Sequence, residues 1–334
     1  MLTEKENYLR VLRGEVPEWL PRNMYAVAGG APPNMGAGPS FMYERRTRTG
    51  GFDIWGVEYT ATKETGGMAI PVPGKFILDD ITKWRDVIKA PDISHIDWET
   101  MSKKDMARID RSQTAVEAMS HVGYFQQLCN FMGFTNGLMA MIEEPEEVLA
   151  LFEYMNEFYM EIARKIRDYY KPDIWTITDD TATAMNPFIS PETYRELVKP
   201  FHAREAEIVL NSGSHIDMHD CGHCEAFIDD WMDFGVTAWN PAQTSNDLKA
   251  IKQKYGRKLI ISGGWDSQRT MGYGDLDDEA LREILMQYVD DLAPNGGFIF
   301  SAFVMGPRDA NGHSKMDVVN DVYENYAKNY YKTH

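Results

Sequence analysis

Apolar and polar positions alternate with a regular period through the second half of the chain, from about residue 173 onward. Short apolar runs bounded by turn-forming residues predict strands, and apolar positions spaced three and four residues apart predict helices. The expected strands are residues 173–178, 215–219, 236–239, 258–262 and 297–303, and the expected helices are residues 191–210, 224–234, 247–255, 277–292 and 315–331. Five strands therefore alternate with helices at short spacing.

Several boundaries carry signals that do not depend on this period. Ser190 followed by Pro191 is a helix N-cap with proline at the first helical position, and Asn246 caps the next helix; glycines at 213, 235 and 256 end helices. Alternating strands and helices predict a parallel sheet with right-handed crossovers, either a closed barrel or an open doubly wound sheet. The barrel is favoured because no G-x-G-x-x-G motif opens the series and polar residues follow several strands.

The first half of the chain is less regular. Thr3 and Glu6 form a capping box for a short first helix that ends near Gly14. Residues 17–74 are rich in Gly, Pro and Met, contain the strand-like runs GFDIWGVEYT and MAIPVPG, and suggest a substrate-covering insertion. Residues 80–91 and 97–109 resemble surface helices, and a long helix begins at Pro145. The apolar segment 123–134 has an ambiguous period that is compatible with a buried strand and a short turn.

We therefore expect an α/β protein with a (β/α)₈ TIM barrel. The whole chain, 1–334, forms one domain in this interpretation. Residues 1–95 are an N-terminal extension and lid-like insertion that covers the barrel mouth, and residues 96–334 form the main barrel. A single barrel domain is compatible with the 334 residues of the chain, because such barrels run from about 200 to over 400 residues.

Composition narrows the functional classes. The chain is 43% apolar and 25% charged, as in soluble globular proteins, and it has no apolar run long enough to span a bilayer or to serve as a signal peptide. We expect a cytoplasmic protein. A net charge of −17 disfavours nucleic acid as a partner, and three cysteines are too few for a disulfide framework.

The expected strands end in polar residues, and in barrels the carboxyl ends of the strands form the active site. A strand-end Asp often caps the following helix instead, but polar groups recur here at five strand ends. The catalytic candidates are Asp179, Asp180, His219 and Asp266, and the substrate-binding candidates are Asn240, Gln243, Trp265, Ser301 and Arg308. A buried pair formed by Asp179 and Asp180 would raise one pKa, as a general acid requires.

His219 and Cys221 lie two residues apart, so on an extended strand both side chains point to the same side. Imidazole nitrogen and thiolate sulfur are zinc ligands, and the pair is a candidate metal site. Because zinc sites use three or four protein ligands, a purely structural role stays open. His223 and Cys224 extend the cluster but fall at the start of the next expected helix.

Longer motifs carry a family resemblance. They are ENYLRVLRGEVPEWLP, FDIWGVEY, DDITKWRDVIKAPD, DDTATAMNPFISPETYRELVKPF and HDCGHCEAFIDDWMDFGVTAWNPAQTSNDLKAIKQKYG followed by KLIISGGWD. Over nearly its whole length the chain resembles the uroporphyrinogen decarboxylase superfamily, and within it the branch of corrinoid-dependent methyltransferases. The family's zinc enzymes combine an H-x-C pair with an acidic residue and a late cysteine. Here His219 and Cys221 match the pair, Gln243 stands at the acidic position, and Ser301 and Ala302 lie where the cysteine is expected.

The resemblance implies a methyltransferase that moves a methyl group from a small methyl ether, often an aromatic one, to the Co(I) corrinoid of a partner protein. The implied partners are a corrinoid-binding protein and a small methyl donor, with a homodimer as a further option; Zn²⁺ is the candidate metal. The alternatives are zinc-dependent transfer from a methylcorrinoid to a thiol, tetrapyrrole decarboxylation, and non-catalytic corrinoid or tetrapyrrole binding. The decarboxylase holds its substrate with an Arg-rich N-terminal motif, whereas PRNMYAVAGG offers only Arg22.

Overall fold

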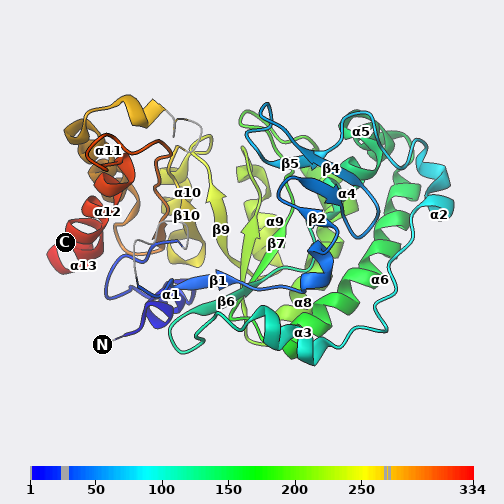
Figure 1. Ribbon diagram of the computed structural model, residues 1–334, viewed down its shortest axis with the longest axis horizontal. Coiled ribbons are helices and arrows are strands. Elements are labelled where there is room, and N and C mark those ends of the chain that lie inside the picture. Colours follow the sequence, from blue (N-terminus) through cyan, green and yellow to red (C-terminus); the bar gives the residue numbers. More distant parts are fainter. Residues whose placement is uncertain (1, 24–29, 267–268, 270–271) are drawn as a thin grey trace.

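A computed structural model describes residues 2–23, 30–266, 269 and 272–334. Its main sheet is curled and has seven parallel strands in the order β1-β6-β7-β8-β9-β10-β11 (Figure 1). The strands are β1 (Asn34–Gly36), β6 (Ala115–Ala118), β7 (Ile174–Thr178), β8 (His215–His219), β9 (Val236–Ala242), β10 (Ile260–Gly263) and β11 (Phe298–Phe300). The predicted α/β class and parallel strand series are confirmed, and the last five strands are the five that the apolar pattern predicts.

A short segment of the chain connects the two edge strands of this sheet, β11 and β1. Arg22 forms a parallel bridge with Phe300 of β11, and the Asn23 amide donates to the Phe300 carbonyl oxygen at 2.8 Å. The chain then continues to β1 at the opposite edge, so the curled sheet is consistent with a TIM-like barrel. Closure with eight strands stays a prediction. The parallel sheet takes in β1, which lies within the segment 1–95 that the sequence assigned to the extension.

Helices pack outside the parallel sheet. The α-helices are α1 (Glu4–Leu12), α2 (Trp84–Val87), α3 (Trp98–Asp105), α4 (Tyr124–Met132), α5 (Phe134–Glu143), α6 (Pro145–Tyr169), α7 (Pro191–Thr193), α8 (Lys199–Leu210), α9 (Ile228–Asp233), α10 (Leu248–Tyr255), α11 (Asp278–Leu292), α12 (Lys315–Asn325) and α13 (Tyr330–Thr333). A π-helical turn, Tyr194–Val198, joins α7 to α8, and short 3-10 turns η5 (Glu225–Phe227) and η9 (Ala327–Asn329) precede α9 and α13. Within the described residues no helix is long and apolar enough to cross a membrane.

The interior of the curled sheet is apolar at one end and polar at the other. Tyr8, Val11 and Leu12 of α1 pack against a layer of small and branched residues at the strand starts, formed by Ala115, Ile174, Ala238, Ile260 and Ile299. Alternate residues of a strand point to the same side. Moving up β7 and β8, the inward positions are therefore Thr176 and Thr178, and Asp217 and His219. Helix α1 closes the amino-terminal end, and the polar residues face the other end.

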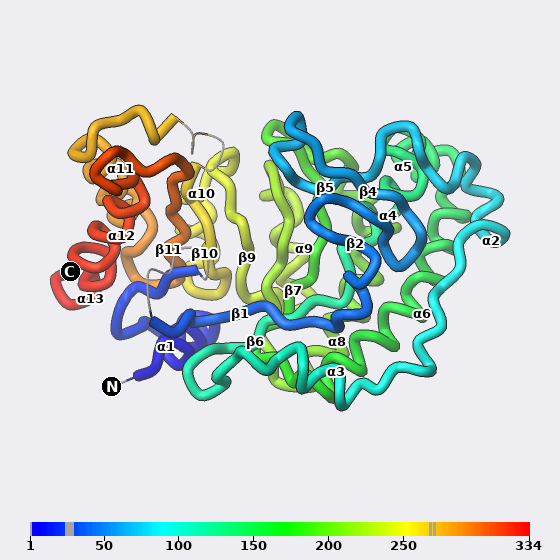
Figure 2. The backbone as a smooth tube through the Cα atoms, viewed as in Figure 1, coloured from blue at the N-terminus to red at the C-terminus, as the bar shows by residue number. Residues whose placement is uncertain are grey.

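A second sheet is antiparallel and has the order β2-β3-β4-β5. Its strands are β2 (Arg46–Thr47), β3 (Gly50–Phe52), β4 (Glu58–Ala61) and β5 (Ala69–Pro71). In Figure 2, β4 and β5 are drawn beside α4 and α5, in the upper part of the view, whereas α1 lies in the lower part. Trp55, between β3 and β4, packs edge-on against Phe131, Phe158 and Tyr159, which anchors this sheet to α4 and α6.

The expectation of a buried strand within residues 123–134 is wrong. Tyr124–Met132 form helix α4, and α5 begins at Phe134. The strand in this part of the chain is β6, which begins earlier at Ala115. The carboxylate of Asp179 explains the helix, because it accepts the backbone N–H groups of Tyr124, Phe125 and Gln126 at 2.9–3.1 Å. These are the first amides of α4, which lack partners within the helix.

Candidate active site

Three metal-ligating side chains meet at the carboxyl ends of β7 and β8. One ligand atom each from Asp180, His219 and Cys221 lies within 4.8 Å of the others, and all three residues are half-buried. His219 is the last residue of β8, Cys221 follows it by two positions, and Asp180 follows β7 by two positions. Because β7 and β8 are neighbouring parallel strands, their loops meet at the same end of the sheet. We refer to this trio as the Asp-His-Cys cluster.

The orientation of His219 is fixed by a chain of hydrogen bonds. Asn240 Nδ2 donates to Asp217 Oδ2 at 2.5 Å, and this leaves Asn240 Oδ1 to accept from His219 Nδ1 at 2.9 Å. The imidazole proton therefore lies on Nδ1, and the lone pair of Nε2 points toward Cys221 Sγ, 4.0 Å away. Partners of this kind hold metal-binding histidines in the correct tautomer and orientation.

Charge around Cys221 supports a cation at the cluster. The Cys221 amide donates to Asp180 Oδ1 at 3.1 Å, which holds the carboxylate beside the thiol. Burial raises the pKa of the Cys221 thiol, and the negative charge of Asp180 raises it further. A metal ion would reverse this effect and favour the thiolate. Oxygen, nitrogen and sulfur ligands that leave a fourth position open fit catalytic zinc.

A cavity of about 420 Å³ runs through the sheet interior beneath His219. Its lining includes Tyr8 at the α1 end, the carboxyl side chains Glu117 and Asp217, and His219 and Asn240 near the cluster. Burial raises the pKa of Asp217 well above its usual value, and the nearby Glu117 carboxylate adds to this effect. The cavity thus has acidic and polar side chains along the strands and reaches His219 of the cluster.

A second cavity, of about 440 Å³, borders Asp180 from the side of the antiparallel sheet. Aromatic rings from three parts of the chain line it, namely Phe76, Phe125, Phe134 and Phe188. Phe134 meets Phe188 edge-on at 4.7 Å between ring centroids. The Asp-His-Cys cluster therefore contributes Asp180 to an aromatic cavity and His219 to a polar one.

The other strand-end candidates have local partners. Asp179 is fully buried and caps α4, so both of its oxygens are occupied by backbone amides. Gln243 Oε1 accepts from the Gly222 amide at 2.9 Å, Ser301 Oγ donates to the Ile299 carbonyl oxygen at 3.2 Å, and Arg308 pairs with Asp317. These contacts hold loops and strand ends together.

His223 and Cys224 are not part of the cluster. His223 Nδ1 donates to the Ser245 carbonyl oxygen at 2.7 Å, and Cys224 Sγ lies 3.1 Å from the Cys221 carbonyl oxygen. In the described residues the third metal-capable side chain beside His219 and Cys221 is that of Asp180. The candidate acidic ligand thus comes from the loop after β7, whereas the family pattern had directed attention to Gln243.

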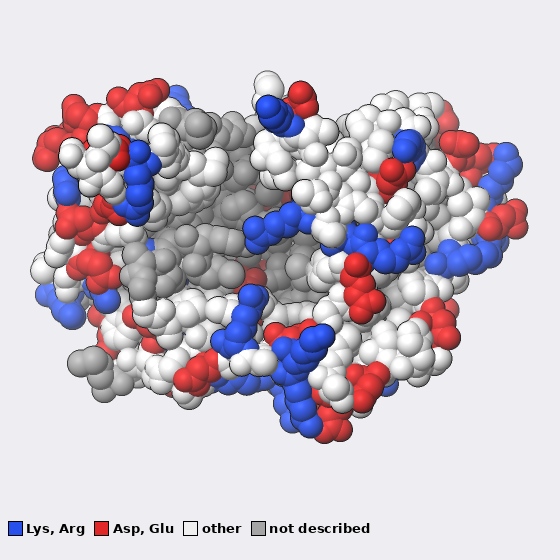
Figure 3. All heavy atoms as spheres, viewed as in Figure 1, with Lys and Arg blue, Asp and Glu red and all other residues white. Residues whose placement is uncertain are grey.

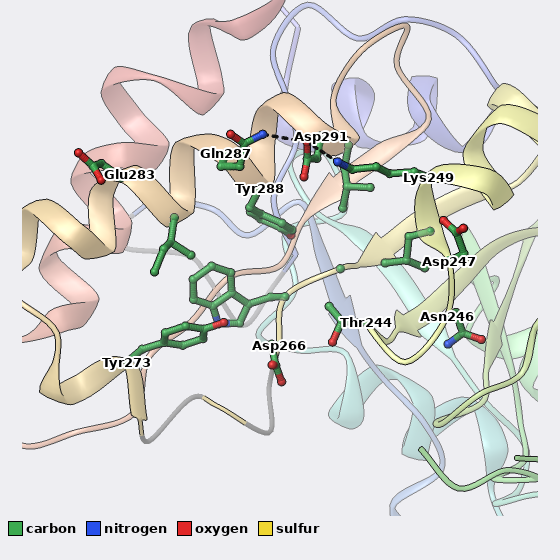
Figure 4. Close-up of a pocket in the computed structure, with 15 residues that line it drawn as sticks. Thr244, Asn246, Asp247, Lys249, Asp266, Tyr273, Glu283, Gln287, Tyr288 and Asp291 are labelled. Atoms are coloured by element: carbon green, nitrogen blue, oxygen red, sulfur yellow. Dashed lines mark hydrogen bonds and ion pairs between the residues drawn. The ribbon is translucent and has the colours of Figure 1, made fainter. Parts of the chain in front are cut away.

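Trp265 and Asp266 line a separate, open pocket of about 620 Å³ that lies between the end of β10 and helices α10 and α11 (Figure 4). Trp265 Nε1 donates to the Phe303 carbonyl oxygen at 2.7 Å, and its ring packs against Tyr273 and Tyr288. None of the three residues of the Asp-His-Cys cluster lines this pocket. The sequence pattern thus grouped residues that lie in two separate sites of the structure, the Asp-His-Cys cluster and this open pocket.

Sequence reasoning missed the polar residues inside the strands, among them Asn34, Glu117, Thr178 and Asp217, which line the polar cavity. A usable signal was present, since polar residues alternate with apolar ones in IWTIT and HIDMH. Arg22, the only arginine in the expected tetrapyrrole-binding position, does not line this cavity. Its guanidinium donates to Asn320 of α12 at 3.0 Å and stacks over the Tyr323 ring.

The fold is an α/β fold with a curled parallel sheet, and its candidate site lies at the carboxyl ends of the strands. The model of the uroporphyrinogen decarboxylase (URO-D) family matches residues 91–302, which is more than half of the chain. The chain belongs to this family, as its motifs predicted. No curated protein sequence matches the chain.

Solved structures add a comparison of the fold. A methyltransferase from Methanosarcina mazei matches 98% of this chain and 99% of its own, with a TM-score of 0.61 and 12% sequence identity. At this identity the match shows a shared fold and nothing finer. Dihydropteroate synthase from Anaplasma phagocytophilum matches 56% of this chain and 66% of its own at 14% identity. Its TM-score of 0.35 is too low to indicate a shared fold.

Proposed function

We propose that this protein is a methyltransferase that moves a methyl group from a methyl ether, with a methoxylated aromatic as the main candidate, to the Co(I) corrinoid of a partner protein. The observation that carries this proposal is the Asp-His-Cys cluster, which contributes to the lining of two cavities. In the reaction the electron pair of cobalt forms the bond to the methyl carbon. The C–O bonding pair leaves on the ether oxygen, which then takes up a proton.

The chain must position the ether, exclude water and neutralise the leaving oxygen. The phenylalanine-lined cavity beside Asp180 suits an aryl ring, because aromatic rings pack well edge-on and offset. Asp180, His219 and Cys221 would hold Zn²⁺, which supplies a Lewis acid for the leaving oxygen. Asn240 keeps Nε2 of His219 free for this role. Asp179 takes no part, because its two oxygens cap α4.

The direct test mixes the purified protein, loaded with zinc, with methoxylated aromatics and a Co(I) corrinoid protein. Methylation of the corrinoid changes its visible absorption spectrum, and we expect this change with at least one donor. His219→Ala should abolish it, whereas the exposed His95→Ala should not. No spectral change with any donor and corrinoid protein tested would refute the proposal.

The three-ligand cluster also supports a second candidate, zinc-dependent transfer of a methyl group from a methylcorrinoid to a thiol. In that case the metal would activate the thiol by lowering its pKa. Methylated thiol product that requires zinc and is lost in Cys221→Ala would favour this direction, and active metal-free protein would exclude it. A corrinoid- or tetrapyrrole-binding protein without catalysis would instead bind its ligand equally well after Asp180→Asn and show no turnover.

The remaining alternative, decarboxylation of a tetrapyrrole, has little support. Such a substrate carries several carboxylates, but the described lining of the polar cavity contains Glu117 and Asp217 and no Lys or Arg. Arg22 is engaged with α12. Incubation with a porphyrinogen should therefore give no decarboxylated product.

A further inference from the structure

The polar cavity beneath His219 carries oxygen atoms that the proposed methyl transfer does not use. Asn34 Oδ1, Thr178 Oγ1 and Asp217 Oδ1 are buried and have no hydrogen-bond partner in the described part of the chain. Their residues are only 2%, 7% and 6% exposed, and all three line the cavity. An unpaired buried polar atom costs about 1–3 kcal/mol, so three around one cavity point to a bound ligand.

Neighbouring bonds determine what this ligand must offer. Asn34 Nδ2 donates to Glu117 Oε2 at 2.6 Å, so the oxygen of the Asn34 amide is the atom left over. Asn240 Nδ2 uses one oxygen of Asp217 and leaves the other. A carbonyl oxygen and a carboxyl oxygen therefore remain as acceptors, and the Thr178 hydroxyl can also accept. A matching ligand is rich in N–H or O–H donors.

The charges of the lining narrow the ligand further. Glu117 and Asp217 both face the cavity, while no Lys or Arg is among its described lining residues. The rings of Tyr8 and Tyr43 also contribute to the lining, and aromatic faces attract cations. An anion would meet two carboxyl groups without a counter-charge. A neutral donor would satisfy the acceptors but would not supply the counter-charge that two neighbouring buried carboxyl groups need in order to ionise together.

The described lining of the cavity contains no Lys or Arg, and the basic side chains visible in Figure 3 lie on the surface. On the face drawn in Figure 3, Lys and Arg side chains stand around the middle of the molecule and acidic ones gather over the α11 and α12 region. These surface groups are open to solvent, where salt screens their fields over roughly 10 Å. The buried acceptors need a donor inside the cavity.

We propose that the polar cavity binds a small protonated amine. Its N–H groups donate hydrogen bonds to Asn34, Thr178 and Asp217, and the carboxyl groups of Glu117 and Asp217 balance its positive charge. A volume of about 420 Å³ lies toward the small end of ligand cavities and suits an amine of a few carbon atoms. His219 and Asn240 also line this cavity, but none of the proposed contacts to the amine requires a metal or a corrinoid, so amine binding can be measured separately from methyl transfer.

The test measures binding of three probes of similar shape by isothermal titration calorimetry. The probes are isobutylammonium, isobutanol and isobutyrate, added to the full-length metal-free protein without a methyl donor or corrinoid. We expect one ammonium ion per chain, bound at least about tenfold more tightly than the alcohol, since hydrogen bonds to charged groups are worth about 1.5–3 kcal/mol. Isobutyrate should not bind.

Variants then locate the site. Thr178→Val keeps the side-chain shape and removes the hydroxyl, and Glu117→Gln removes one charge; each should weaken ammonium binding about tenfold. Glu157→Gln, on the exposed face of α6, is the matched control and should bind as the unaltered protein does. Thermal melts verify that each variant is folded, and Thr178→Val alone is sufficient if Glu117→Gln is unstable.

Several results would overturn this assignment. They are equal affinity for ammonium and alcohol, preference for the carboxylate, or ammonium binding that neither variant weakens. Absence of binding by all three probes would mean that the cavity holds only water. Because no methyl group is transferred in this experiment, its failure leaves the proposed methyltransferase activity untouched, and failure of that activity leaves the amine site untouched.

Discussion

Replacement of Asn240 by leucine tests how much the orientation of His219 contributes to metal binding. Leucine branches at Cγ as asparagine does, with two bulkier methyl groups in place of the amide atoms, and it cannot form hydrogen bonds. The change removes the 2.9 Å bond to His219 Nδ1 and the 2.5 Å bond to Asp217. The ligand atoms of the Asp-His-Cys cluster are left in place, so any loss of zinc affinity reports on the support of His219.

The expected magnitude follows from the position of the lost bond. Loss of the hydrogen-bond partner of a metal-binding histidine typically costs 10–100-fold in metal affinity, or about 1.4–2.8 kcal/mol. We expect this range for Asn240→Leu, because the His219 ring becomes free to rotate and the tautomer with the proton on Nε2 becomes accessible. His219→Ala removes the ligand itself and should weaken zinc binding further.

Competition with a chromogenic zinc chelator measures this affinity. Asn211→Leu, an exposed position at the end of α8, is the matched control and should leave zinc binding unchanged. Circular dichroism verifies that both variants are folded. If Asn240→Leu is folded and its zinc affinity stays within about twofold of the unaltered protein, the role assigned to Asn240 is wrong.

Three further predictions concern stability. Asp179→Ala should lower the free energy of unfolding in urea by about 3 kcal/mol, because three buried amides of α4 lose their acceptor; a loss below about 1 kcal/mol would contradict the capping role. Gly123→Ala should destabilise by about 2 kcal/mol or more, since φ is +106° and a Cβ would lie 2.4 Å from Asp179 Oδ1, and an unchanged melting temperature would refute this. Burial acts to raise the pKa of Asp230, but Arg195 and Lys199 outweigh it and the pKa is lowered. Its contribution to stability is therefore complete above the ordinary carboxyl pKa of 3.8 and is lost as the pH falls through the lowered value. Urea titrations of Asp230→Asn and the unaltered protein should differ at pH 7 and converge at low pH.

The five strands of the second half were predictable because their signals are local. Residues 215–219 were expected as a strand and form β8 with the same bounds. A short apolar run between turn-forming residues needs little help from distant contacts to become a strand. His219 and Cys221 were identified for the same reason, since their spacing on a strand is a local property.

Helix α4 shows where local information ended. Residues 123–134 form a short, mainly apolar segment, and at this length the apolar period does not distinguish a strand from a helix. The distinction comes from Asp179, which follows β7 and lies about 55 positions further along the chain; its buried carboxylate holds the first turn of the helix. The same contact converted a catalytic candidate into a helix cap.

The sequence by itself determined the strand and helix series of the second half, the family and the polar ends of those strands. Only the tertiary structure decided which polar residues meet. In the structure Asp180, which follows β7, lies beside His219 and Cys221. Trp265 and Asp266 line a different pocket, and Asn34, Glu117 and Asp217 line one common cavity. The physical reason is that a strand's alternation defines its two faces, whereas the inward face and its neighbours are set by the curl and register of the whole sheet.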